Sequence, residues 1–122
     1  MLYSHKNEIV DRVMLSKTEQ AIQAFLSQVR QRYEVTGAFL FGSHARTDFR
    51  PDSDTDVAVL LHGTPKPRID AALDMAEIAF DVLMDTGILI EALPIWDEEW
   101  EHPERFNNPA LIENIRREGI RL

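Results

Sequence analysis

Apolar residues recur along this chain with two different periods, and these periods predict a mixture of helices and strands. From about residue 17 to residue 33, apolar side chains repeat at the spacing of one helix face. This stripe consists of Ile22, Phe25, Leu26, Val29 and Tyr33. Because Ser16-Lys17-Thr18-Glu19 has the pattern of a capping box, we expect the helix to begin there.

Three short apolar runs predict the strands of one sheet. The first starts at Gly37 and ends at Phe41, the second spans residues 57–61, and the third spans residues 88–95 with Pro94 near its end. The second run contains no polar residue, so we expect a central strand that is buried on both faces.

Two further helices are predicted after the second strand. The longer one starts at Arg68 or Ile69 and stops before Gly87, a residue that suits a helix end. Its apolar stripe consists of Ile69, Ala72, Leu73, Ala76, Ala79, Phe80 and Leu83. The shorter helix spans residues 110–118. This order of elements predicts an α/β (α+β) fold, in which a small mixed β-sheet is flanked by helices that pack mainly on one face.

The composition fits one domain that spans residues 1–122. A hydrophobic fraction of 44% and a charged fraction of 28% are ordinary for a globular protein. A chain of this length buries about two-thirds of its unfolded surface, which is enough for one core. The absence of cysteine excludes disulfides and thiolate metal sites. No apolar run has the length of a membrane span and the N-terminus lacks a signal-peptide pattern, so we expect a cytoplasmic protein.

The formal net charge of −8 bears on the kind of partner. Affinity for nucleic acid comes mainly from Lys and Arg on phosphates, so this balance argues against direct binding to DNA or RNA. An acidic surface suits a basic protein partner better. The alternative interpretation is that the charge serves solubility alone.

The densest chemical signal is Gly42-Ser43, followed after ten residues by Asp54-Thr55-Asp56. Gly42 ends a strand and allows the backbone to approach a ligand closely, and Ser43 stands at a corner suited to phosphate oxygens. Asp54 and Asp56 open the next strand at positions i and i+2, so their carboxylates share a face roughly 7 Å apart. Such a pair repels unless a cation lies between, and Mg²⁺ suits these ligands.

A second interpretation of the acidic pair is a solvated turn after Pro51. The position of Gly42-Ser43 after one strand favours the functional interpretation, because it places a phosphate site and a metal pair at adjacent strand ends. A further acidic residue, Glu91, interrupts the third apolar run. A carboxylate in such a run is costly unless it is paired, bound to metal, or on an edge strand that meets water.

These residues resemble the signature of the nucleotidyltransferase superfamily related to DNA polymerase β. The surrounding Phe-Gly-Ser-x-Ala-Arg and Arg-Pro-x-Ser-Asp-x-Asp are similar to its small prokaryotic branch, the minimal nucleotidyltransferases (MNT), which act as antitoxins beside HEPN-domain toxins. The resemblance continues into Asn-Pro-Ala-Leu-Ile-Glu-Asn-Ile-Arg-Arg-Glu-Gly-Ile near the C-terminus. His44 and Thr47 depart from the pattern, where Arg and Gly are common.

The resemblance implies a set of site residues. Two Mg²⁺ ions would be held by Asp54 and Asp56, with Glu91 as the third acid of the superfamily and Asp81 and Asp85 as weaker alternatives for it. Nucleotide contacts would come from Gly42, Ser43, Arg46 and Ser53.

The implied activity is a Mg²⁺-dependent transfer of AMP from ATP to a tyrosine of a cognate HEPN RNase toxin, within a hetero-oligomer of the two proteins. Two alternatives remain open. One is a non-catalytic antitoxin that acts by binding alone, and the other is nucleotidyl transfer to a small molecule such as an aminoglycoside.

Overall fold

The structure is a computed structural model that describes residues 5–42 and 55–122, with side chains from residue 17 onward. The elements, in chain order, are α1 (His5–Arg30), β1 (Val35–Phe41), β2 (Thr55–Leu61), α2 (Arg68–Thr86), β3 (Ile90–Trp96), α3 (Asp97–Glu101), the 3-10 turn η2 (Pro103–Arg105), α4 (Pro109–Glu118) and β4 (Ile120–Arg121). None of the described helices is both long and apolar enough to cross a bilayer.

The strands form one four-stranded mixed sheet in the order β3-β2-β1-β4. β2 pairs antiparallel with β1 and parallel with β3, and the parallel pair is connected through α2. The prediction of a buried central strand is confirmed, since every residue of β2 except Asp56 is buried. The short strand β4 was not predicted, because two residues carry too little periodicity to be recognised.

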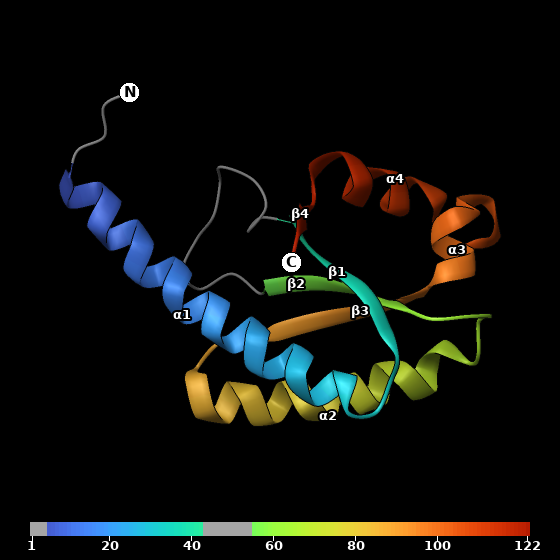
Figure 1. Ribbon diagram of the computed structural model, residues 1–122, viewed down its shortest axis with the longest axis horizontal. Coiled ribbons are helices and arrows are strands. Elements are labelled where there is room, and N and C mark those ends of the chain that lie inside the picture. Colours follow the sequence, from blue (N-terminus) through green and yellow to red (C-terminus); the bar gives the residue numbers. More distant parts are fainter. Residues whose placement is uncertain (1–4, 43–54) are drawn as a thin grey trace.

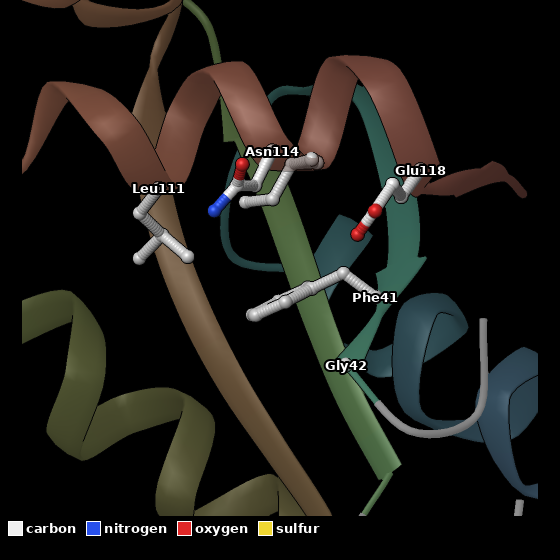
Figure 2. Close-up of a pocket in the computed structure, with 6 residues that line it drawn as sticks. Phe41, Gly42, Leu111, Asn114 and Glu118 are labelled. Atoms are coloured by element: carbon white, nitrogen blue, oxygen red, sulfur yellow. The ribbon is translucent and has the colours of Figure 1, made fainter. Parts of the chain in front are cut away.

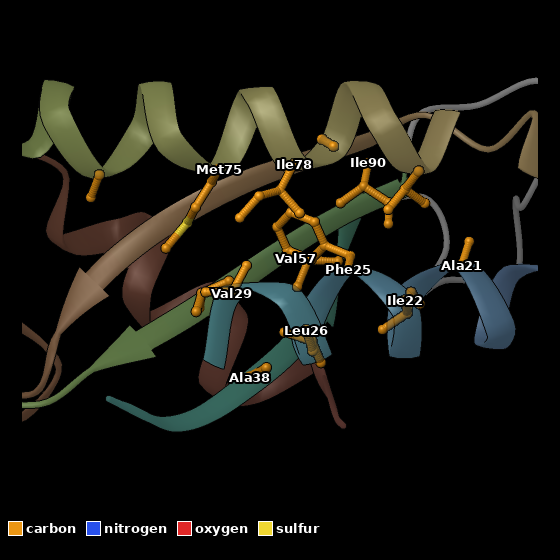
Figure 3. Close-up of a cluster of buried hydrophobic side chains, with 14 of the residues drawn as sticks. Ala21, Ile22, Phe25, Leu26, Val29, Ala38, Val57, Met75, Ile78 and Ile90 are labelled. Carbon is orange, nitrogen blue, oxygen red and sulfur yellow. The ribbon is translucent and has the colours of Figure 1, made fainter. Parts of the chain in front are cut away.

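Helices α1 and α2 cover one face of the sheet (Figure 1). The core between them contains Phe25 and Leu26 from α1, Val57 from β2, and Met75 and Ile78 from α2, all of them at most 1% exposed. Figure 3 shows these side chains meeting between the helices and the sheet.

The opposite face of the sheet is covered by α4, with α3 beside it (Figure 1). Ala58, Leu60 and Ile95 from the sheet pack there against Ile112 and Ile115 of α4. The expectation that helices lie mainly on one face holds for the two long helices, α1 and α2, but it did not include the cover that α4 and α3 form on the other face. The physical reason is that the apolar side of α4 has to be buried, and the face that α1 and α2 leave open is where it packs.

Helix α1 begins earlier than the sequence predicts. It runs from His5 without interruption through the capping-box residues, and Thr18 is buried within it. No glycine or proline lies between residues 5 and 30, and Lys, Glu and Gln are good helix formers, so this polar stretch continues the helix instead of starting it.

Helix α2 has the predicted length and ends at Gly87, which adopts the left-handed conformation with φ 75°. The stripe that it buries differs from the predicted one. The buried side chains are Ala71, Met75, Ile78, Ala79 and Val82. Three members of the predicted stripe, Ile69, Leu73 and Phe80, are about 60% exposed, at 62%, 61% and 58%. Helix α2 is apolar around most of its circumference, so periodicity alone does not select the side that faces the sheet.

A buried ion pair connects the start of α2 with α3. The guanidinium of Arg68 donates to both carboxylate oxygens of Glu99, at 3.0 and 2.5 Å, and to the carbonyl of Pro94 at 2.7 Å. Glu99 is 3% exposed and also accepts from the backbone N–H of Trp96. The Arg68 guanidinium lies over the rings of Trp96 and Phe106. This pair fixes the junction between the two helical layers.

Candidate active site

The described candidate residues meet at one end of the sheet. β1 runs antiparallel to β2, so its last residue Phe41 lies opposite Asp56, the second residue of β2. β3 runs parallel to β2, so its own second residue, Glu91, lies beside Asp56 in register. Gly42 directly follows β1. Residues that are far apart in the sequence are thus brought together by strand pairing.

Asp56 and Glu91 also share a face of the sheet. Side chains alternate along a strand, so Asp56 is on the side of Ala58 and Leu60, and Glu91 is on the side of Leu93 and Ile95. All four of these apolar residues belong to the core beneath α4. Asp56 is half-buried, whereas Glu91 is exposed on the edge strand β3.

The donor set at this position fits a divalent cation. Neighbouring strands are about 4.8 Å apart, so two paired carboxylates on one face are close enough to share an ion. Carboxylate oxygens are the ligands that Mg²⁺ prefers. Within the described part of the chain no group of three or more metal-ligating side chains gathers. The predicted set of three includes Asp54, which lies outside that part.

Gly42 contacts the carboxylate of Asp56 so closely that a side chain at position 42 would displace this carboxylate. A Cβ atom built on Gly42 would lie 2.3 Å from Oδ2 of Asp56, and the backbone at Gly42 has a φ of 72°, which L side chains rarely adopt. Both facts favour glycine at this position. The backbone turn after β1 is therefore formed directly against the acidic residue of β2.

The remaining predicted residues are placed as follows. Ser43, Arg46, Ser53 and Asp54 lie outside the described residues, so their roles stay predictions. Asp81 and Asp85 belong to α2, which packs on the opposite face of the sheet from Asp56. Among the described acidic residues considered for the third position, only Glu91 lies next to Asp56.

A pocket of about 240 Å³ adjoins this site between the end of β1 and α4. It is lined by Phe41, Gly42, Leu111, Asn114, Ile115 and Glu118. Figure 2 shows the ring of Phe41 beneath the helix, with Leu111, Asn114 and Glu118 projecting from α4 toward it. Sequence analysis did not assign these helix residues to a site. The available signal was their spacing of three and four positions, which places Leu111, Asn114 and Glu118 on one helix face.

One polar group of this pocket, the side-chain amide of Asn114, is oriented by a neighbouring residue. Oδ1 of Asn114 accepts a hydrogen bond from the guanidinium of Arg117 at 2.7 Å. The amide nitrogen of Asn114 is then the atom that offers hydrogen-bond donors to a ligand. The side chain thus has a defined orientation next to an apolar surface made by Phe41 and Leu111.

The basic residues near the C-terminus are engaged in contacts within the protein. Arg116 donates to the carbonyl of Trp100 and lies over its ring at 4.7 Å, and Arg121 lies over the ring of Phe39 at 5.6 Å. Phe39 and Trp100 are themselves stacked, with ring centroids 5.1 Å apart. These contacts join β1, α3 and α4 beside the pocket.

Comparison with known proteins adds a family assignment to this geometry. The family described as "Polymerase beta, Nucleotidyltransferase" matches residues 20–96, a range that includes Gly42, Asp56 and Glu91 and ends before α4. A crystal structure of a Sulfolobus solfataricus protein, described as a candidate nucleotidyltransferase, superposes with a TM-score of 0.49 at 16% identity, over 87% of this chain and 85% of that one. No curated protein matches the chain.

Proposed function

The chain belongs to the polymerase beta nucleotidyltransferase family, and we propose that it transfers AMP from ATP to a tyrosine of a HEPN toxin and thereby neutralises that toxin. The observation that carries the proposal is the pairing of Asp56 with Glu91 on neighbouring strands, on one face of the sheet and against the turn at Gly42. A nucleotidyl transfer needs acidic groups and a phosphate-binding turn at one place, and the position of Gly42 against Asp56 and Glu91 supports such a site.

In the proposed reaction the phenolic oxygen of the tyrosine attacks the α-phosphorus of ATP. The bond from that phosphorus to the bridging oxygen of the pyrophosphate breaks, and the phenolic proton passes to solvent. Asp54, Asp56 and Glu91 would hold Mg²⁺, which when bound stabilises negative charge on the phosphates and lowers the pKa of the attacking hydroxyl. The turn at Gly42 and Ser43 would orient the triphosphate through its backbone N–H groups.

The pocket under α4 supports a nucleotide as the donor. Its apolar lining by Phe41, Leu111 and Ile115 suits the flat face of a base. We propose that the amide of Asn114, oriented by Arg117, donates to a ring nitrogen of adenine. Since Phe41 directly precedes Gly42, a base in this pocket would place its phosphates toward the turn and the carboxylates.

A protein acceptor is supported by charge. The net charge of −8 makes nucleic acid an unfavourable acceptor and a basic protein a favourable one. The assignment of that protein as a HEPN toxin rests on the resemblance to the MNT antitoxins described above. A hetero-oligomer of the two proteins follows from the same proposal.

The experiment is an adenylylation assay with a HEPN protein, and the genes next to the gene for this chain are the place to search for it. The two proteins are incubated with labelled ATP and Mg²⁺, and mass spectrometry locates the modification. We expect AMP on a tyrosine with the native chain and none with Asp56→Asn. A toxin that is neutralised without any adduct would overturn the transfer and favour an antitoxin that acts by binding alone.

A further inference from the structure

Helix α2 carries a second apolar face that points away from the sheet. Ile69, Leu73, Phe80 and Met84 are 62%, 61%, 58% and 63% exposed, and Ala76 lies between them. Ile69, Leu73, Ala76 and Phe80 follow one another at intervals of three and four residues, and Leu83 and Met84 lie three and four residues beyond Phe80. This is the spacing of a seam that packs against another helix. No element in the described part of the chain covers this seam. In Figure 1, α2 lies at the outside of the molecule.

A groove runs beside this seam. It has a volume of about 460 Å³ and lies between α2 and β3, which is an edge strand of the sheet. Ala72, Ala76 and Ala79 line it from the helix together with Phe80. Ile90, the first residue of β3, and Leu89, which precedes the strand, line the other side. The small alanine side chains leave room for larger apolar side chains of a partner. The groove thus has both the shape and the polarity of a site for an amphipathic helix.

One flank of the seam is uniformly acidic. An acidic residue directly follows every apolar position of the seam except Leu83, so the acids form a parallel row about 100° around the helix. The row consists of Asp70 after Ile69, Asp74 after Leu73, Glu77 after Ala76, Asp81 after Phe80 and Asp85 after Met84. All except Asp74 are exposed. The basic residue of α2, Arg68, is bound to Glu99 and does not neutralise the row. One member of the row, Asp74, is paired at 3.9 Å with Arg32, which follows α1.

We propose that this surface, the seam of α2 with its groove and acidic row, docks an amphipathic helix of the acceptor protein that carries a row of Lys or Arg beside its own apolar seam. The inference rests on the proposed function insofar as the acceptor is a protein. Charge selects the occupant, because a basic row on the partner faces the acids while the apolar seams fill the groove. An antiparallel pairing with a second copy would bring two acidic rows together, which like charges disfavour.

The surface extends to β3, the edge strand that carries Glu91 of the candidate active site. The groove is lined at one end by Glu91, which lies in register with Asp56. The carboxylates of Asp56 and Glu91 are on the face of the sheet opposite α2, so an acceptor whose helix is seated on α2 would reach them around the edge of β3. Docking on α2 raises the effective concentration of the acceptor hydroxyl there, and such positioning is a large part of the catalysis of a transfer reaction.

The test uses the full chain and two synthetic peptides of about three heptads, both with Leu along the seam. One peptide carries Lys on the flanking positions and the other carries Glu, and binding is measured by fluorescence anisotropy. We expect the Lys peptide to bind at least about tenfold more tightly than the Glu peptide. We expect Leu73→Ser with Phe80→Ser to weaken binding by about tenfold, whereas Leu122→Ser, at an exposed leucine elsewhere, has no effect.

Charge reversal gives the sharper result. We expect Glu77→Lys with Asp81→Lys to invert the preference so that the Glu peptide binds more tightly, and Glu113→Lys on the exposed side of α4 to leave the preference unchanged. The double substitution Leu73→Ser with Phe80→Ser is called the seam variant. Equal binding of both peptides to the native chain, or peptide binding that does not change in the seam variant, would overturn the docking surface. Dimerisation of the native chain that is lost in the seam variant would assign the surface to a second copy instead.

The proposed AMP transfer and the proposed docking surface can be tested independently of each other. The seam variant is expected to raise KM for the protein acceptor and to leave kcat unchanged, while Asp56→Asn is expected to keep peptide binding. Native transfer kinetics in the seam variant would overturn the docking surface alone. Seam-dependent peptide binding by a chain that transfers no AMP to any protein would overturn the proposed function alone.

Discussion

Gly42 and Asp56 are in such close contact that the carboxylate occupies the space of a side chain at position 42, with only 2.3 Å between Oδ2 and an ideal Cβ. We predict that Gly42→Ala lowers transfer by at least about 100-fold, because the methyl group displaces the carboxylate. It should also destabilise the fold by about 1–2 kcal/mol through the positive φ.

Gly87→Ala is the matched control for this variant. Its φ of 75° is nearly that of Gly42, but nothing lies within 4 Å of its Cβ position. It should lose about 1 kcal/mol of stability and no activity. Equal activity losses in the two variants would show that backbone strain, and not contact with Asp56, explains the defect. Thermal melts and labelled ATP measure both properties.

The acidic pair gives the second prediction. Asp56→Asn, like Asp54→Asn, should abolish nucleotidyl transfer, because each change removes a carboxylate that would hold Mg²⁺. The same changes reduce repulsion between neighbouring carboxylates, so the melting temperature without metal should hold or rise. Mg²⁺ should stabilise the native chain more than either variant. Full transfer activity in either variant would contradict the role of the pair.

Glu91 gives the third prediction. Glu91→Gln should reduce the transfer rate by about 100-fold or more and leave ATP binding largely intact, because the third acid would act mainly on the attacking hydroxyl in the transition state. The comparison is Glu19→Gln, an exposed position on α1. Calorimetry measures ATP affinity and the labelled assay measures rate. Unchanged turnover would assign Glu91 to the solvated edge of β3.

The pair of Arg68 and Glu99 gives the fourth prediction. Arg68→Met leaves the carboxylate of Glu99 buried without its partner and should reduce the free energy of unfolding by about 2–4 kcal/mol. Adding Glu99→Gln removes that unpaired charge and should recover part of the loss. Urea unfolding of both variants tests this. A double variant that is no more stable than Arg68→Met would show that lost packing on Trp96 and Phe106 dominates.

The fifth prediction concerns Tyr33. Burial raises its pKa from 10.0 to about 12, and its hydrogen bond to Asp74 contributes to the same shift. The unfolded chain releases this proton near pH 10, so the stability linked to Tyr33 is fully present below pH 10 and is lost as the pH rises toward 12. Tyr33→Phe should remove this part of the alkaline loss, and urea unfolding at increasing pH measures it. Identical pH profiles would contradict the shift.

Local patterns in the sequence determined most of the elements. The strands around residues 37–41 and 57–61, the long α2 with its end at Gly87, and α4 all follow from periodicity and end signals that involve only near neighbours. The same holds for the position of Gly42 at a strand end and of Asp56 at a strand start. A property carried by adjacent residues can be predicted from those residues.

Which distant residues and elements become neighbours was decided only by the tertiary structure. The register of β3 on β2 places Glu91 next to Asp56, and nothing near Glu91 in the sequence encodes that pairing. The pocket formed by Phe41 with Asn114 depends on α4 returning over the face that α1 leaves open. Helix α2 offers two apolar faces, and which one meets the sheet depends on how Met75 and Ile78 fit against α1 and β2. Strand register and the choice of the buried helix face depend on contacts between segments that are distant in the sequence. They therefore become defined only when those segments pack.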